Sequence, residues 1–144
     1  MGKMDISFDS ELLTLEPIAD GELSKKMLLS AAPHVKAVFK NNLEKAIGSG
    51  NRKKDRSTGE LLSSVGITGV RKNRDGYWDI KIGVSGKDSN GVRNGLKAGV
   101  LEHGKSNQPA RPFARPTVKQ VKNHVYETMR RVLDEELKKN GNTQ

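Results

Sequence analysis

Apolar residues recur at helical spacing in two long stretches, one in each half of the chain. The first begins at Asp20, whose side chain suits an N-cap, and continues through Ile47 until Gly48 ends it. Pro33 lies inside this stretch, where its missing amide hydrogen predicts either a kink or the start of a second helix. The positions that recur are Leu28, Ala31, Ala32, Val35, Phe39, Asn42, Leu43 and Ala46.

The second helical stretch follows a proline-rich segment near the end of the chain. Pro116 suits the first helical position, and the apolar spacing continues to about Lys139. The predicted inner face comprises Val118, Val121, Val125, Thr128, Val132 and Glu136, flanked by Met129, Leu133 and Leu137.

A β-hairpin is predicted between the two helices. Residues 65–72 form a candidate strand, Asn73-Arg74-Asp75-Gly76 carries a hairpin-turn signal, and residues 77–84 alternate as a return strand. In the return strand Trp78, Ile80, Ile82 and Val84 are expected to face one way. Just before the hairpin, Ser57 and Glu60 have the spacing of a capping box, which predicts a short helix.

The remaining segments have weaker patterns. The first 19 residues fit either a strand or a short helix, and the pattern does not decide between them. Residues 86–95 are polar and glycine-rich and read as a flexible loop, whereas residues 96–103 form a short apolar element of undetermined type. Three prolines make residues 108–116 an extended segment.

These elements predict an α+β fold, a small antiparallel β-sheet covered by an N-terminal and a C-terminal amphipathic helix. The length suits a single domain over residues 1–144. Within it we expect an ordered core over about residues 20–139 and mobile loops at about 49–56 and 86–95.

The distribution of charge along the chain indicates possible partners. The chain has a net charge of +9, yet residues 1–23 hold six acids and one lysine, so the other residues carry +14. Such a basic surface attracts nucleic acid or an acidic protein. The same uneven distribution of charge is explained if the acidic N-terminal residues of one subunit contact a basic surface of a neighbouring subunit. Both interpretations stay open. Two basic clusters are candidate contact loops for DNA or a partner: Arg52, Lys53, Lys54 and Arg56, then Lys87, Arg93 and Lys97.

Patterns that carry catalysis or metal binding are not found in the sequence. There is no cysteine, which excludes disulfides and thiolate chemistry, and no apolar run long enough to span a bilayer. The histidines, His34, His103 and His124, are far apart, and His124 is expected to be a solvated helix residue. We predict no catalytic residues, no metal and no cofactor.

The segment from Gln108 to Pro116 is the most unusual local feature. Its prolines fix the backbone, Phe113 projects an apolar anchor, and Arg111 and Arg115 flank that anchor. Burying the ring is worth about 1.5–3 kcal/mol, enough to lock the segment against the sheet. The segment is interpreted as a brace that aims the last helix, as a contact strip between subunits, or as both.

This segment carries a resemblance to a known family. Its matching positions are Glu102, Gly104, Ser106, Gln108, Pro109, Ala110, Arg111, Pro112, Phe113, Arg115 and Pro116. A second matching step comprises Thr58, Gly59 and Leu61 before the first hairpin strand. Together, over about residues 20–139, they resemble the phage tail-component family, although Lys105 stands where that family usually has threonine and Ala114 replaces a larger apolar residue.

The resemblance implies a structural virion protein at the head–tail junction or tail terminus, a tail-completion or neck component that assembles without catalysis. The implied partners are other copies of the chain in a ring, connector or neck proteins and tail-tube proteins, close to duplex DNA and away from membranes. Assembly would take place in the bacterial host cytoplasm. The alternative from another class is a small basic nucleic-acid-binding protein.

Overall fold

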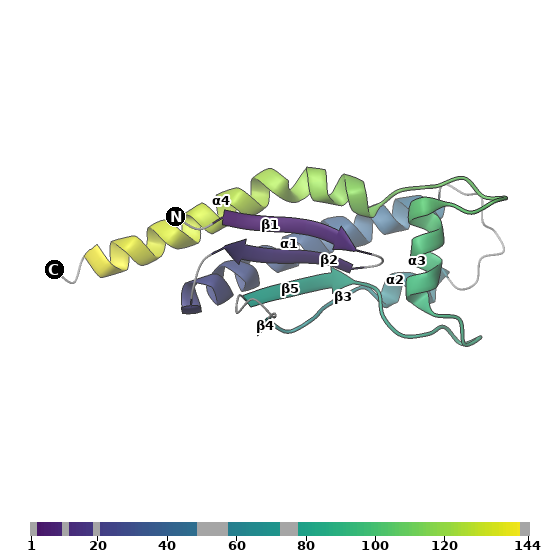
Figure 1. Ribbon diagram of the computed structural model, residues 1–144, viewed down its shortest axis with the longest axis horizontal. Coiled ribbons are helices and arrows are strands. Elements are labelled where there is room, and N and C mark those ends of the chain that lie inside the picture. The colour runs from purple at the N-terminus through teal and green to yellow at the C-terminus, as the bar shows by residue number, and fades with distance from the viewer. Residues whose placement is uncertain (1–2, 10–11, 19–20, 49–57, 73–77, 142–144) are drawn as a thin grey trace.

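A computed structural model describes residues 3–9, 12–18, 21–48, 58–72 and 78–141, with the backbone alone for 3–9, 12–18, 21–22, 48, 58 and 139–141. The elements are β1 (Lys3–Asp9), β2 (Leu12–Ile18), α1 (Gly21–Gly48), α2 (Thr58–Ser63), β3 (Gly66–Ile67), β4 (Arg71–Lys72), β5 (Trp78–Gly83), α3 (Asn94–His103) and α4 (Ala114–Gly141). The predicted α+β fold is confirmed, with the long helices α1 and α4 flanking an antiparallel sheet (Figure 1).

The sheet has the order β1-β2-β5-β3, and β4 pairs with the same side of β5 as β3 does. The apolar alternation predicted for the return strand is confirmed at Ile80 and Ile82, which are 1% and 0% exposed. Asp79 and Gly83 on the opposite face are buried as well. β5 is the inner strand at this point of the sheet, with β2 on one side and β3 and β4 on the other.

The predicted strand over residues 65–72 is interrupted at its middle. Two short strands, β3 and β4, are separated by residues 68–70. At the break, the amide of Thr68 donates to the carbonyl of Lys81 at 2.9 Å, and the Lys81 amide donates to the Thr68 hydroxyl at 3.0 Å. Such an irregular strand at the side of a sheet is a poor template for further strand pairing. The predicted turn at 73–76 lies outside the described residues.

The undecided N-terminal stretch forms a β-hairpin. β1 pairs with β2 from Lys3 opposite Ile18 to Asp9 opposite Leu12. β2 in turn pairs with β5, placing Leu13 opposite Ile82 and Leu15 opposite Ile80. This long-range pairing with β5 makes the hairpin part of the main sheet.

α1 runs unbroken through Pro33, so the alternative of a second helix starting at that proline is wrong. The proline removes the hydrogen bond to the carbonyl four residues earlier, that of Leu29. Both residues are exposed, Leu29 at 58%, so water can satisfy that carbonyl. A proline on the outer face therefore costs this helix less than one on its inner face would.

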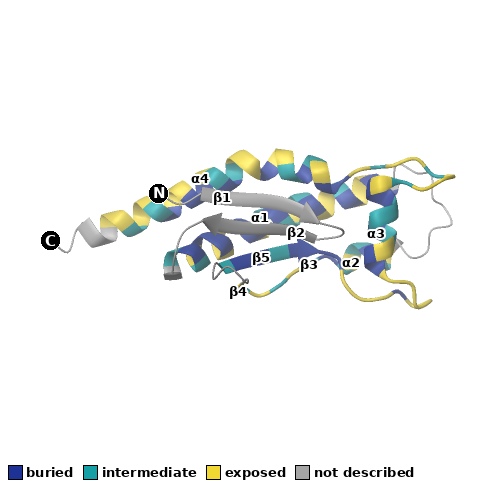
Figure 2. Ribbon diagram, in the orientation of Figure 1, coloured by how far each residue is buried: buried dark blue, intermediate teal, exposed yellow. Residues whose placement is uncertain are grey.

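α4 begins at Ala114, two residues before the predicted start at Pro116. Its inner face agrees with the prediction at Val121, Val125, Thr128 and Val132, which are buried (Figure 2). The prediction is wrong at Leu137, which is 60% exposed because the C-terminal part of the helix extends beyond the sheet (Figure 1). No helix in the described ranges has the length and hydropathy to cross a membrane.

Residues 86–93 form a hydrogen-bonded turn, and the last two residues of the predicted loop, Asn94 and Gly95, belong to α3. Asp88 organises the turn, because one carboxylate oxygen accepts the amides of Asn90 and Val92, each at 2.9 Å. The bridge between Lys87 and Arg93 closes it, and Asn94 and Gly95 are buried at the start of α3. The element of undetermined type at 96–103 is the rest of this helix.

Candidate functional site

A buried carboxylate on α3 holds the end of the proline segment. Glu102 is 3% exposed, and its Oε1 accepts the backbone amides of Phe113 at 2.9 Å and Ala114 at 2.8 Å. Its Oε2 accepts the amide of Arg115 at 3.4 Å. These are the first, otherwise unpaired amides of α4, and a negative charge there also suits the helix dipole. Glu102 is therefore the N-terminal cap of α4 and explains why that helix starts before Pro116.

Phe113 is the anchor that the sequence predicted. The side chain is 1% exposed, and its ring meets that of Phe39 edge to face, with centroids 5.3 Å apart and an interplanar angle of 79°. Its aromatic partner lies on α1, and the ring belongs to the same hydrophobic core as Ile80 and Ile82 of the sheet. The Phe39–Phe113 pair joins the start of α4 to α1.

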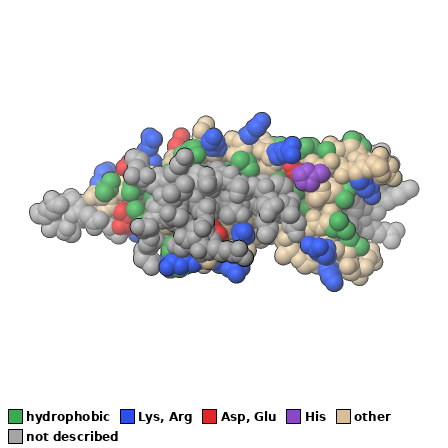
Figure 3. All heavy atoms as spheres, viewed as in Figure 1, with side chains coloured by type: hydrophobic (Ala, Val, Ile, Leu, Met, Phe, Trp, Pro, Cys, Tyr) green, Lys and Arg blue, Asp and Glu red, His purple; other side chains and the backbone are tan. Residues whose placement is uncertain are grey.

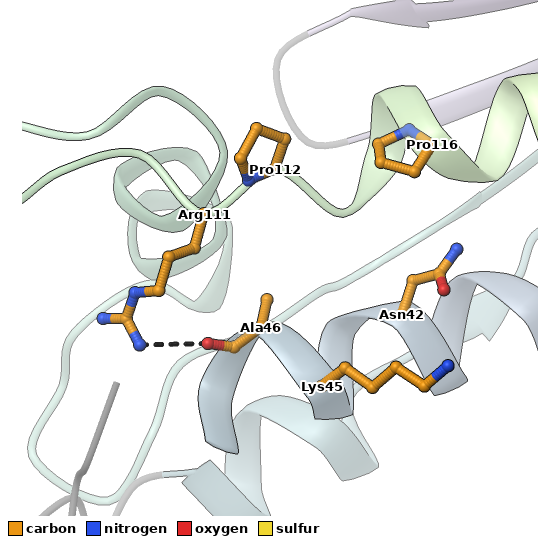
Figure 4. Close-up of a pocket in the computed structure, with 6 residues that line it drawn as sticks. All are labelled: Asn42, Lys45, Ala46, Arg111, Pro112 and Pro116. Atoms are coloured by element: carbon orange, nitrogen blue, oxygen red, sulfur yellow. Dashed lines mark hydrogen bonds between the residues drawn. The ribbon is translucent and has the colours of Figure 1, made fainter. Parts of the chain in front are cut away.

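Arg111 ties the same segment to the end of α1. Its guanidinium Nη1 donates to the carbonyl of Ala46 at 3.0 Å, and its amide donates to the carbonyl of Leu101 at 2.6 Å (Figure 4). A cation on a last-turn carbonyl favours the negative end of the α1 dipole. The contact borders an open pocket of about 330 Å3, lined by Asn42, Lys45, Ala46, Arg111, Pro112 and Pro116.

Gly104 makes the sharp departure from α3 possible. Its φ is +78°, and a Cβ there would lie 2.8 Å from the Ala110 nitrogen and 2.9 Å from the Gln108 oxygen. Both obstructing atoms are backbone, so no side chain can move aside to make room. A glycine is required at this position for the conformation and for the close approach alike.

The outer part of the segment is a tight, exposed turn. Lys105 and Gln108 exchange two backbone hydrogen bonds, of 2.9 and 3.0 Å, around Ser106 and Asn107. Lys105, Ser106, Asn107 and Pro109 are all exposed. The turn projects at the end of the molecule where α3 lies (Figure 1). We call residues 105–109 the tip, and the buried contacts of Glu102, Arg111 and Phe113 form its base.

The second matching step, at α2, contributes to the core and to a neighbouring loop. Leu61 is 4% exposed within the core, Thr58 begins the helix and Gly59 is exposed. The predicted short helix is confirmed. The Glu60 carboxylate accepts from the amide and the hydroxyl of Ser89, at 2.7 and 2.8 Å, so it links α2 to the turn at 86–93.

Of the two predicted contact loops, the structure describes only the second. Arg52, Lys53, Lys54 and Arg56 lie outside the described residues. Lys87 and Arg93 are exposed at the closure of the Asp88 turn. Lys97 forms an ion pair within the chain, because its ammonium donates to the Asp88 carboxylate at 2.9 Å. That hydrogen bond, with those from the Val92 and Asn90 amides, lowers the pKa of Asp88.

The structure brings together two histidines that the sequence separates. The rings of His34 on α1 and His124 on α4 lie 3.7 Å apart between centroids and are tilted by 32°. The prediction that His124 is simply solvated is wrong, because it is half-buried against this partner. Burial, and then the charge of His124, lower the pKa of His34 below its ordinary value.

We expect this pair to make stability depend on pH. A lowered folded-state pKa means that the unfolded chain binds more protons once the pH falls below about 6.5. Stability is therefore fully present above that value and declines as the pH falls towards the lowered pKa of His34. Thermal unfolding at pH 7.5 and pH 5.5 should show a smaller fall in Tm for His34→Gln than for the unmodified protein. An equal fall in both proteins would contradict a role for this histidine.

No described group of three or more histidine, cysteine, aspartate or glutamate side chains could hold a metal ion. Comparisons with protein-family models, curated proteins and solved structures found no match to this chain.

Proposed function

We propose that the chain is a structural virion protein of a tailed bacteriophage, at the head–tail junction or the tail terminus. It acts as a tail-completion or neck component by binding other copies of itself in a ring, together with connector and tail-tube proteins, and it performs no catalysis. Its place of assembly is the bacterial host cytoplasm.

The observation that carries the proposal is the division of the motif segment into a fixed base and an exposed tip. Glu102, Arg111 and Phe113 hold the base through a buried cap, a carbonyl contact and an aromatic pair. The tip at 105–109 is largely exposed. Fixing a loop in advance lowers the entropy cost of binding, which suits a contact between subunits.

The two ends of the long axis also offer surfaces for a neighbour. Leu96 on α3 is 60% exposed beside an open pocket of about 350 Å3, and Leu137 near the far end of α4 is also 60% exposed (Figure 1). The residues that line the pocket are Arg93, Gly95, Leu96, Gly99, Val100, His103 and Gly104. A head-to-tail contact between different surfaces generates a closed ring when the rotation between subunits closes.

Native mass spectrometry over a range of protein concentrations tests the assembly role. We expect a ring-sized oligomer, formed by the protein alone or with connector and tail-tube proteins. Lys105→Glu at the tip should shift the spectrum towards monomer, because it reverses a charge in the proposed contact. Lys40→Glu, at an exposed position of α1 that does not line the pocket beside Arg111, is the matched control and should retain the oligomer. A protein that stays monomeric under all these conditions would contradict the proposal.

The alternative function, a small basic nucleic-acid-binding protein, is favoured by one specific observation. The outer face of α4 carries a line of basic side chains: Arg115, Lys119, Lys122 and Arg130.

A further inference from the structure

Four basic residues form a stripe along the exposed side of α4. Arg115, Lys119, Lys122 and Arg130 are all exposed. With 3.6 residues per turn, their Cα positions fall within about 80° around the helix axis and extend over about 22 Å. We call these four residues the α4 stripe. Figure 3 shows lysine and arginine side chains along the edge of the molecule that α4 forms, with acidic side chains among them.

The part of α4 that carries Arg115, Lys119 and Lys122 has no acidic residue before Glu127. Two exposed acids lie beside the Arg130 end of the stripe: Glu127 falls about 60° and Asp134 about 40° outside it around the axis. Tyr126 is the residue within the stripe between Lys122 and Arg130, and it is half-buried. The side chains are carried on the outside of a helix whose opposite face is packed in the core, so they extend from a rigid support.

This arrangement fits a regular line of negative charges better than an acidic protein surface. Protein interfaces usually place aromatic or aliphatic anchors at their centre, whereas this stripe is made of lysine and arginine. Phosphates of a nucleic-acid backbone present charge at regular intervals without requiring an apolar anchor. Binding of single strands relies on stacking aromatics, and a single half-buried tyrosine provides little of that, so a duplex is favoured.

We propose that the α4 stripe binds the phosphate backbone of duplex nucleic acid without sequence preference. The site differs from the contact loops expected from the sequence, one of which holds Lys97 in an ion pair with Asp88. The inference stands apart from the assembly role, because a single chain carries the complete stripe.

The test is binding of a fluorescent DNA duplex, measured by anisotropy at several salt concentrations. Each phosphate contact contributes about −0.9 to the slope of log K against log salt, so four contacts predict a slope of about −3.6. The double variant Lys119→Gln, Lys122→Gln should bind more weakly and reduce the slope by about 1.8. Glutamine is well tolerated in exposed helix positions, and thermal unfolding checks that the variant is folded.

Lys40→Gln, Lys72→Gln, at exposed positions of α1 and β4, is the matched control, since it removes the same charge from outside α4. We expect it to leave the slope within about 0.5 of the unmodified value, well below the change of about 1.8 for the stripe variant. Equal effects of the two variants would mean that net charge alone attracts DNA, and would overturn the proposal. Absence of duplex binding at low salt, or tighter binding of a single strand than of the duplex, would overturn it too.

A duplex RNA of the same length distinguishes the source of the phosphates. Similar slopes for the two duplexes support recognition of the shared backbone. Binding of the RNA duplex alone would overturn backbone recognition, because the same phosphate charge is present in both. Native mass spectra of the two lysine variants report assembly separately, so loss of DNA binding and loss of the ring can be told apart.

Discussion

Replacing Phe113 by alanine should lower the free energy of unfolding by about 3–5 kcal/mol. The ring is 1% exposed and packs edge to face on Phe39, so its loss leaves a cavity between α1 and the start of α4. The surrounding backbone has little freedom to collapse into that cavity, because Pro112 fixes the residue before it and the Glu102 cap fixes the residues after it. Urea denaturation at a concentration where the protein is monomeric would measure the loss, since assembly adds its own stabilisation.

Leu96→Ala is the matched control for this experiment. Leu96 is also a large apolar residue, but it is 60% exposed, so its truncation should change stability by no more than about 0.5 kcal/mol. The same substitution should weaken the oligomer if the pocket along α3 receives a neighbour. A loss below about 1 kcal/mol for Phe113→Ala would contradict the burial of this ring in solution.

The two long helices and the central hairpin strand were predictable because their patterns are local. An apolar repeat such as Val121, Val125 and Val132 indicates the inner face of a helix without knowledge of what covers it. In the same way, Ile80 and Ile82 mark one face of a strand. Local pattern fails where an element leaves the body of the fold, as α4 does at Leu137.

The N-terminal hairpin could not be assigned from sequence because its partner is distant in the chain. Leu13 and Leu15 of β2 lie opposite Ile82 and Ile80 of β5, almost seventy residues later. A seven-residue segment with scattered apolar positions fits a helix or a strand until such a partner is known. Pairing with β5 decides the question in favour of the strand.

The histidine pair was missed for a related reason. The side-chain amide of Asn42 donates to the Thr117 hydroxyl at 2.9 Å and to the Gln120 side-chain oxygen at 3.0 Å, which shows where α1 and α4 lie side by side. His34 is eight residues before Asn42, and His124 is seven residues after Thr117, so on antiparallel helices both lie about 11–12 Å further along. Only this register brings the two rings to 3.7 Å.

The motif segment shows how much of a candidate site a sequence can reveal. The sequence identified Glu102, Gly104, Arg111 and Phe113 as positions that matter, but the roles of Glu102 and Arg111 depend on contacts with other elements. If residues 102 and 103 were on a strand, Glu102 and His103 would face opposite sides of the sheet. On the helix that forms instead, Glu102 is buried beneath α4 while His103 is exposed. The residues around Glu102 in the sequence give no signal that this acid caps a helix that begins twelve residues later.

Glu102→Ala should destabilise the fold by about 3 kcal/mol or more. The substitution removes the acceptor for three amides at the start of α4, and a buried unpaired donor costs about 1–3 kcal/mol. Glu102→Gln keeps the shape and one acceptor oxygen but loses the charge at the helix N-terminus, so we expect a smaller loss of about 1–2 kcal/mol. Glu127→Ala, at an exposed position of α4, is the control and should change stability by no more than about 0.5 kcal/mol.

Hydrogen exchange would show whether the loss arises at the cap. In Glu102→Gln the amides of Phe113, Ala114 and Arg115 should exchange faster than in the unmodified protein, while those around Val125 follow only the global stability. Frayed residues at 113–115 would also release the base of the tip, so the same variant should weaken the oligomer more than its stability change alone predicts. If Glu102→Ala and Glu102→Gln both lost less than about 1 kcal/mol, with unchanged exchange at these three amides, the cap would not be what positions α4.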